Sequence, residues 1–198
     1  MMNVMLDVKT LQGRSVRYPA DVTAARHERI LEGATRLIRE RGLNGVSVPE
    51  IMKAAKLTHG PFYNHFSSRE ALVTEVIDRA LGALASEISA VKSSKVARRQ
   101  FLDSYLSLEH RDNPAEGCAI AALASDVGRN PPAKTPFTRR LKQVLAAVAA
   151  KFSTGGKDGS RAEAIRLLAQ IVGALILARA VDDSELSEEI LEKTRAAL

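Results

Sequence analysis

The residue types that could do chemistry gather in one short run, HGPFYNHF at positions 59–66. His59 and His65 are potential metal ligands, and Tyr63 and Asn64 carry hydrogen-bonding groups. Because the two histidines are six residues apart, they lie about 600° apart around a helix and point in different directions. No cysteine or acidic residue stands between them. The spacing therefore does not predict a metal site.

The same run separates into an apolar and a polar side. Phe62 and Phe66 are four residues apart, so they share one face of a helix and are expected to be buried. Tyr63, Asn64 and His65 lie on the remaining arc, where a passive surface would carry lysine and glutamate. An asparagine amide can pair bidentately with adenine, and tyrosine and histidine can donate to phosphate oxygens. The pattern favours contact with DNA over a plain corner of the core.

Helix signals precede this run and must position it. Apolar residues recur at helical spacing over residues 30–38, which predicts a helix that begins near Asp21 or Thr23 and ends at Gly42. The capping box SVPE, at positions 47–50, predicts a second, short helix over about residues 48–56.

The run itself and the residues after it complete the unit. A third short helix is expected from His59 to about Phe66. Ser67 and Glu70 suggest a second capping box, which opens a long apolar-patterned helix over residues 68–91. Two short helices joined by a tight turn behind a longer helix are the outline of a helix-turn-helix unit.

At these residues the sequence resembles the TetR family of one-component bacterial transcriptional regulators. The resemblance covers residues 24–76 and lies in an apolar helix ending in RG, followed by VSVPEIMKAAKLTHGPFYNHFSSREAL. The sequence departs from the family pattern at Met52, where alanine is usual, and at Lys56, where glycine is usual. A lysine in a left-handed turn position would cost about 1 kcal/mol. Neither departure removes a group that would face DNA.

The resemblance also implies roles for individual residues. Gly60 would let the backbone approach DNA closely. The residues expected to contact phosphates are Ser47, Thr58, Tyr63, His65 and Arg69, and those expected to face base edges are His59, Pro61 and Asn64.

The net positive charge of the chain is consistent with binding to an anionic partner such as DNA. The 198-residue chain carries a net charge of +6, with 29 basic and 23 acidic side chains. Residues 1–70 hold 11 Lys and Arg against 7 Asp and Glu, so +4, which leaves +2 for residues 71–198. The first 21 residues are expected to form a flexible basic arm, followed by a DNA-binding domain over 22–67 and a regulatory and dimerisation domain over 68–198.

Other bulk features predict a cytoplasmic protein without a membrane partner. Cys118 is the only cysteine, so no intramolecular disulfide can form. The start of the chain lacks an apolar stretch of signal-peptide length. The longest near-apolar run, over 171–181, is shorter than the ~20 residues needed to cross a bilayer.

The rest of the chain is also expected to be helical, which predicts an all-α fold of about nine helices. The stretches 128–136 and 153–160 are rich in proline, glycine and polar residues, and are interpreted as linkers. The further predicted helices cover residues 95–110, 115–129, 137–152, 161–181 and 185–197.

The predicted helix over 161–181 is apolar on most of its circumference and needs cover on nearly every side. Two interpretations remain open, a central helix of the subunit's own core and a dimer interface; the resemblance implies a homodimer. The residues predicted for that interface are Leu168, Ile171, Val172, Leu175 and Ile176.

The resemblance further implies a small-molecule effector, with neither a cofactor nor a metal. The candidate pocket residues are Phe101, Tyr105, His110 and Cys118, because they combine aromatic rings and polar groups with the aliphatic side chains around them, as small-molecule pockets do. Each also has a plainer explanation. Phe101 and Tyr105 could be ordinary core residues, and Cys118 a small buried hydrophobe.

The leading hypothesis is a TetR-like transcriptional repressor that binds palindromic operator DNA as a homodimer and is released by a small-molecule effector. The alternative is a helix-turn-helix dimer whose C-terminal half serves dimerisation or a protein partner without a ligand. A helical enzyme built on His110 and Asp112 has no supporting pair of general acid and base, and no nucleophile, so the protein is not expected to be an enzyme.

Overall fold

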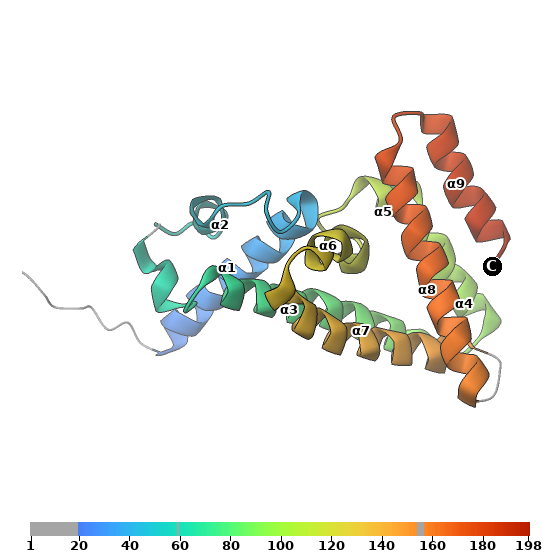
Figure 1. The fold of residues 1–198 in the computed structure, drawn as a ribbon, viewed down its shortest axis with the longest axis horizontal. Coiled ribbons are helices and arrows are strands. Elements are labelled where there is room, and N and C mark those ends of the chain that lie inside the picture. The colour runs from blue at the N-terminus through green and yellow to red at the C-terminus, as the bar shows by residue number, and fades with distance from the viewer. Residues whose placement is uncertain (1–19, 59, 154–156) are drawn as a thin grey trace, which may run out of the picture.

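The computed structural model describes residues 20–58, 60–153 and 157–198. Within those ranges every regular element is a helix, so the predicted all-α fold is confirmed (Figure 1). The predicted N-terminal arm lies almost wholly outside the described residues. The elements are α1 (Ala20–Arg41), α2 (Val48–Ala54), the 3₁₀ helix η1 (Gly60–Asn64), α3 (Arg69–Ala90), α4 (Lys95–Tyr105), α5 (Leu108–Asp112), α6 (Ala119–Gly128), α7 (Pro131–Phe152), α8 (Lys157–Ala180) and α9 (Ser184–Ala196).

Local signals account for the ends of the first two helices. Gly42 ends α1 with a φ of 79°, a conformation that glycine adopts without steric cost. The predicted capping box is present, because the Ser47 hydroxyl accepts from the backbone N–H of Glu50 and the Glu50 carboxylate accepts from that of Ser47. α2 ends at Ala54, two residues earlier than expected, and Lys56 takes a φ of 55° in the turn that follows.

The predicted capping box at the start of α3 is wrong. Ser68 is the N-cap, and its hydroxyl accepts from the backbone N–H of Ala71 at 3.1 Å. The cap thus lies one residue later than Ser67, and the third helical residue is an alanine, which has no side-chain acceptor to complete a box. α3 then continues to Ala90 and runs from the helix-turn-helix end of the molecule into the other half (Figure 1).

Several boundaries in the second half differ from expectation, among them the start of α8, which lies at Lys157 and so within the stretch 153–160 interpreted as a linker. The helix predicted over 95–110 breaks after Tyr105, because Ser107 caps a separate α5 by accepting from the backbone N–H of His110. The stretch before residue 119 is turn rather than helix, which shortens α6. α7 begins at Pro131 inside a stretch interpreted as a linker, since a proline in the first turn loses no hydrogen bond.

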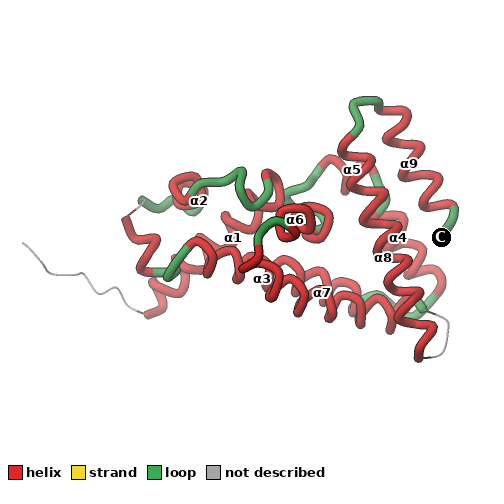
Figure 2. The backbone as a smooth tube through the Cα atoms, viewed as in Figure 1, coloured by secondary structure: helices red, strands yellow, loops and turns green. Residues whose placement is uncertain are grey.

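Helices α3 and α7 lie side by side along much of their length (Figure 2). Asp78 of α3 accepts from Arg139 at 2.7 Å and from Arg140 at 2.8 Å, both on α7. Burial would raise the pKa of Asp78, but the hydrogen bonds from the two arginines outweigh it and lower that pKa. This cluster stabilises the contact between the two helices.

One connected cluster of buried apolar side chains extends from Ile30 in α1 to Leu191 in α9. The helix-turn-helix unit and the rest of the molecule therefore share a core, in which α3 is the common element. α8 and α9 pack against each other at the far end of the molecule (Figure 1). None of the helices in the described ranges is both long and apolar enough to span a membrane.

Candidate functional site

The polar arc that the sequence assigned to DNA lies on η1 and faces solvent. Phe62 and Phe66 are buried, at 0% and 2% exposure, whereas the Tyr63 side chain is 68% exposed. Asn64 and Thr58 are also exposed. His59 lies outside the described residues. Gly60 and Pro61 belong to the backbone of η1, which is a 3₁₀ helix rather than the α-helix expected.

His65 lies closer to the core than its neighbours on this arc. Its Nδ1 is buried without a hydrogen-bond partner, and its ring lies 6.3 Å from that of His27 in α1. Burial, followed by the nearby His27 and Arg26, lowers the pKa of His65. The lowered pKa favours the neutral form of the ring, and because Nδ1 is buried, only Nε2 remains for a partner outside the protein.

His27 is a positioning residue that the sequence did not reveal. Its ring stacks on Phe66 at a centroid distance of 4.4 Å, and its Nε2 lies 2.8 Å from a carboxylate oxygen of Glu75. It thus ties α1 both to the segment that follows η1 and to α3. In the described part of the chain, no three His, Cys, Asp or Glu side chains are grouped to hold a metal ion.

Arg69 and Ser47, both predicted to contact phosphates, have partners inside the protein. The guanidinium group of Arg69 donates to the carbonyl oxygens of Leu43 and Val46, the latter at 3.0 Å, which ties the loop before α2 to α3. The hydroxyl of Ser47 donates to Glu50 at 2.6 Å. Both side chains therefore shape the helix-turn-helix unit, and their contact with phosphate stays a prediction.

Asp126 connects the helix-turn-helix unit to the other half of the molecule. Its carboxylate, on α6, accepts from the backbone N–H of Leu43 at 2.7 Å. A Cβ atom at Gly42 would collide with that same carboxylate, so glycine is needed there for space as well as for its φ. The two partners are 83 residues apart in sequence. No local pattern could have predicted this contact.

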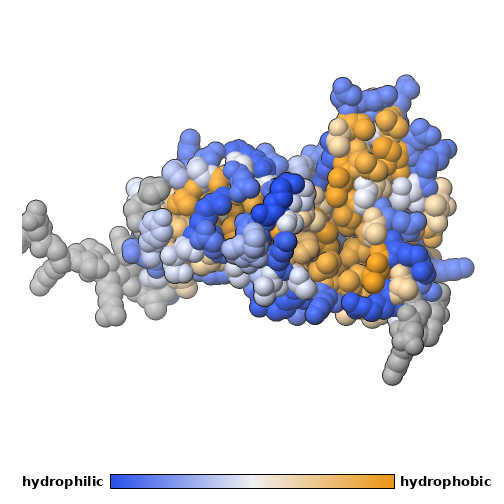
Figure 3. Space-filling model, viewed as in Figure 1, coloured by the Kyte–Doolittle hydropathy of each residue, from blue (hydrophilic) through white to orange (hydrophobic). Residues whose placement is uncertain are grey.

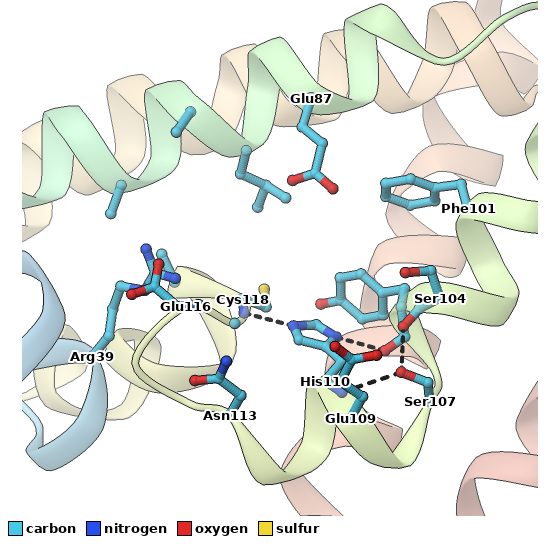
Figure 4. A pocket seen from close by; sticks show the side chains of 16 residues that line it. Arg39, Glu87, Phe101, Ser104, Ser107, Glu109, His110, Asn113, Glu116 and Cys118 are labelled. Carbon is cyan, nitrogen blue, oxygen red and sulfur yellow. Dashed lines mark hydrogen bonds between the residues drawn. The ribbon is translucent and has the colours of Figure 1, made fainter.

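A cavity of about 300 Å³ lies between the end of α1, α3, α4, α5 and the start of α6 (Figure 4). All four candidate pocket residues, Phe101, Tyr105, His110 and Cys118, line it. The Phe101 and Tyr105 rings lie 6.0 Å apart, centre to centre. The volume is at the lower end of the range for small-molecule sites.

His110 uses both ring nitrogens to build the wall of this cavity. Nδ1 donates to the backbone oxygen of Tyr105 at 2.6 Å, and Nε2 accepts from the backbone N–H of Cys118 at 2.8 Å. These bonds require a neutral ring that carries its proton on Nδ1, and burial lowers the pKa of His110. The second bond also satisfies a backbone donor at the start of α6.

Neither His110 nor Cys118 is arranged for reaction. With both nitrogens engaged, His110 has no free position for proton transfer, and Asp112 pairs instead with Arg111 at 2.7 Å. The Cys118 thiol is 4% exposed, and burial raises its pKa. A protonated, buried thiol is a poor nucleophile.

The cavity also receives charged side chains that sequence inspection missed. Glu87 reaches it from α3 and Arg39 from the last turn of α1; Glu116 lies beside Arg39, and Glu109 lies next to His110 (Figure 4). Glu116 forms an ion pair with Arg36 at 3.2 Å. Arg39 and Glu87 look like ordinary polar positions of amphipathic helices, so only the fold reveals that they share a cavity.

Four of the five residues predicted for the dimer interface are buried within the subunit itself. Leu168, Ile171, Val172 and Leu175 are at most 9% exposed, because they face α7 and α9; only Ile176 is exposed, at 42%. These four residues therefore have little exposed surface left for a partner, since an apolar circumference alone does not tell which face of a helix is covered within the subunit. Exposed apolar side chains that remain on α8 include Ile165, Ala169, Ile176, Leu177 and Ala180, and these five are called the α8 strip below.

Comparison with known proteins identifies the helix-turn-helix unit. The model of the family described as "Bacterial regulatory proteins, tetR family" matches residues 30–76. The chain is 30% identical over 112 residues to the HTH-type transcriptional repressor KstR2 of Rhodococcus jostii (strain RHA1), a match that covers 55% of each chain. It is 31% identical over 101 residues to the repressor DhaR of Mycobacterium sp. (strain GP1), covering 50% of this chain and 51% of DhaR. These matches span about half the length of either relative.

Solved structures extend the similarity to nearly the whole fold. The reduced form of Escherichia coli NemR aligns with a TM-score of 0.72 at 20% identity, covering 87% of this chain and 94% of NemR. A TetR-family regulator from Agrobacterium tumefaciens aligns with a TM-score of 0.72 at 19% identity, covering 89% and 98%. The chain belongs to the TetR family. That family consists of transcriptional regulators and not of enzymes.

Proposed function

We propose that the protein is a transcriptional repressor that binds palindromic operator DNA through the exposed arc of η1. The observation that carries the proposal is the exposure of Tyr63 and Asn64 on a helix-turn-helix unit whose phenylalanines are buried. Exposed asparagine and tyrosine side chains on a recognition element suit base edges and phosphates. Lys53 and Lys56 are exposed just before η1 and would add attraction to the DNA backbone.

The roles proposed for the other residues of this surface follow the same geometry. Thr58 is exposed before η1 and is proposed to contact phosphate with Tyr63; His65 would do so through Nε2. Asn64 is proposed to read a base edge. His59, Gly60 and Pro61 keep the roles that their positions in the family motif imply.

The protein is proposed to act as a homodimer through the α8 strip. The residues of that strip leave part of the α8 surface apolar and uncovered, and Figure 3 shows apolar surface over α8 beside α9. A Cβ atom at Gly173 would meet nothing within 4 Å in the subunit, so the subunit's own packing does not require a glycine there. A closely approaching partner helix would explain it.

A two-fold dimer matches the proposed DNA site. It would present two copies of η1 to half-sites about one helical turn, roughly 34 Å, apart on the same side of the duplex. Such a protein acts where the chromosome is, so we place it in the cytoplasm of a bacterial cell.

The cavity supports a small-molecule effector. It is enclosed by elements of both halves, with Arg39 on α1 and Tyr105 on α4, so a ligand held there would contact both. This observation favours the ligand-responsive repressor over the alternative of a dimerisation or protein-partner module without a ligand. No cofactor is part of the proposal.

Selection of bound sequences from a random DNA pool tests the DNA-binding proposal. The full chain should enrich an inverted repeat whose half-sites are centred about one turn apart. Affinity for that sequence should fall steeply with salt, as counterions are released from DNA. If the pool yields no enriched sequence at low salt, the proposal is wrong.

A further inference from the structure

Two buried hydrogen-bond donors without partners lie at the same cavity. Among the described residues, three buried side-chain nitrogen or oxygen atoms have no partner: Arg39 Nε, His65 Nδ1 and the Tyr105 hydroxyl. Arg39 and Tyr105 both line the cavity, and Tyr105 is only 7% exposed. An unpaired polar group is costly to bury, so two at one site indicate that a partner from outside binds there.

The two groups define what that partner must supply. The Nε–H of Arg39 can only donate, and a tyrosine hydroxyl donates readily. The Cys118 thiol lies close enough to the Tyr105 hydroxyl for each group to shift the pKa of the other, but sulfur is a weak acceptor, and by distance and angle the hydroxyl has no hydrogen-bond partner. His110 has both nitrogens engaged by backbone groups. The missing group is therefore an oxygen acceptor rather than a donor.

The charged side chains around the cavity limit the chemical class of the ligand further. A guanidinium group pairs best with a carboxylate, whose oxygens can accept from two donors at once. Glu87, Glu109 and Glu116 all lie at the cavity and are exposed to solvent, and of these Glu116 is paired with Arg36 at 3.2 Å. A ligand with a second negative charge would therefore be repelled. The arrangement thus favours a single negative charge at the Arg39 side.

Size and lining describe the rest of the ligand. The cavity volume is about 300 Å³, which suits a single ring or a short chain. Phe101, Leu84 and Ala80 supply apolar surface against which such a body would pack.

We propose that the cavity binds a compact monocarboxylate, whose oxygens accept from the Nε–H of Arg39 and the hydroxyl of Tyr105. The inference rests on the proposed function, in which this cavity is the effector site. Arg39 lies in the last turn of α1, three residues before Gly42, and Leu43 is held by Asp126 and Arg69. A carboxylate between α1 and α4 would therefore act directly on the end of α1 and on the loop that leads to α2.

Matched small molecules test the charge and the acceptor separately. Titration calorimetry on the full chain would compare benzoate, phenylacetate and hexanoate with their neutral amides, and with benzylamine as a cation of the same size. At least one carboxylate should bind about tenfold or more tightly than its amide, because a charge-assisted hydrogen bond is lost in the amide. Equal or tighter binding of benzylamine would overturn the inference and indicate that the glutamates govern the site.

The variant Tyr105→Phe gives the sharpest structural test, since it removes only the hydroxyl. If that hydroxyl awaits a ligand, the ligand-free variant should melt at the same or a higher temperature than the natural protein, while carboxylate affinity falls about tenfold. A lower melting temperature with unchanged carboxylate affinity would overturn the proposal, because the hydroxyl would then be satisfied within the protein.

A pair of arginine variants tests the other donor. Arg39→Gln should abolish the preference for carboxylate over amide, and Arg29→Gln, on the exposed side of the same helix, should leave it unchanged. Unaltered preference in Arg39→Gln would contradict the assignment.

The ligand inference and the proposed function can fail independently. Calorimetry without DNA reports on the ligand alone, and operator binding without ligand reports on the repressor alone. If none of the three carboxylates binds while the operator does, the ligand inference is overturned and DNA binding stands. If a carboxylate binds without weakening operator affinity, its role as effector is wrong although its binding site is correct.

Discussion

At the scale of single residues, His110 is a hydrogen-bonded link between two helices rather than a reactive group. Its ring joins the end of α4, through the backbone oxygen of Tyr105, to the start of α6, through the backbone N–H of Cys118. Arg179 of α8 adds hydrogen bonds to the backbone oxygens of His110 and Arg111, at 2.6 and 2.9 Å. The cavity wall is therefore fixed from three directions.

This geometry makes stability depend on pH. Because burial lowers the pKa of His110 below its usual value of 6.5, the unfolded chain binds the proton more readily than the folded one. The contribution of neutral His110 to the free energy of unfolding should be fully present above pH 6.5. It should be lost as the pH falls from there through the pKa of His110 in the folded protein. Urea unfolding at a series of pH values measures the slope.

The variant His110→Gln cannot titrate and should show a shallower fall in stability between pH 6.5 and 5 than the natural protein. His65, whose pKa is also lowered, contributes separately, so His65→Gln should reduce the slope independently. An unchanged slope in the His110 variant would refute the assignment.

At the scale of elements, the turn between α2 and η1 carries a local strain. Lys56 has a φ of 55°, and side chains other than glycine pay for that conformation. Lys56→Gly should therefore increase the free energy of unfolding by about 0.5–1 kcal/mol, as measured by urea denaturation. Lys56→Ala keeps the Cβ atom and should not gain; an equal gain in alanine would mean that the lysine side chain, not the backbone, is the cause.

The elements also show what sequence can and cannot predict. Caps and turns such as Gly42 and the box at Ser47 follow from near neighbours, so the helix-turn-helix unit was predicted almost completely. The cap at Ser68 was placed one residue early, because two serines stand together and only the fold selects between them.

Contacts between elements far apart in the sequence could not be predicted, for a different reason. The four pocket candidates do share a cavity, yet Arg39 and Glu87 were missed because their role depends on where α1 ends and how α3 crosses it. The sequence does not single out the face of α8 that stays exposed, because the helix is apolar on most of its circumference and only the packing against α7 and α9 shows which side is left uncovered.

At the scale of the whole molecule, α3 and the shared core make the helix-turn-helix unit and the cavity parts of one body. The segment before α2 is held by Asp126 of α6 through Leu43 and by Arg69, the first residue of α3, and Arg39, the proposed ligand contact, lies shortly before it in α1. A shift of this segment in each subunit of a dimer would change the distance between its two recognition elements.

The dimer itself is testable through the α8 strip. Leu177 is the most exposed large apolar side chain of the α8 strip, at 57%, and Leu177→Glu would place two buried charges at the proposed two-fold interface. Light scattering after gel filtration should show monomers, with helical content unchanged. Val96→Glu, at an equally exposed apolar position on α4, should remain dimeric; if both variants stay dimeric, the α8 strip is not the interface.

The central claim is that the exposed arc of η1 binds operator DNA. Fluorescence anisotropy of the selected operator, titrated with the natural chain and with a Tyr63→Ala, Asn64→Ala double variant, tests it most directly. Since both side chains are exposed, the variant should keep its fold and its oligomeric state. We predict salt-sensitive binding of two subunits per operator by the natural chain and at least about tenfold weaker binding by the variant, since each lost base or phosphate contact costs about 1–3 kcal/mol. Equal operator affinity of the two proteins would contradict the claim.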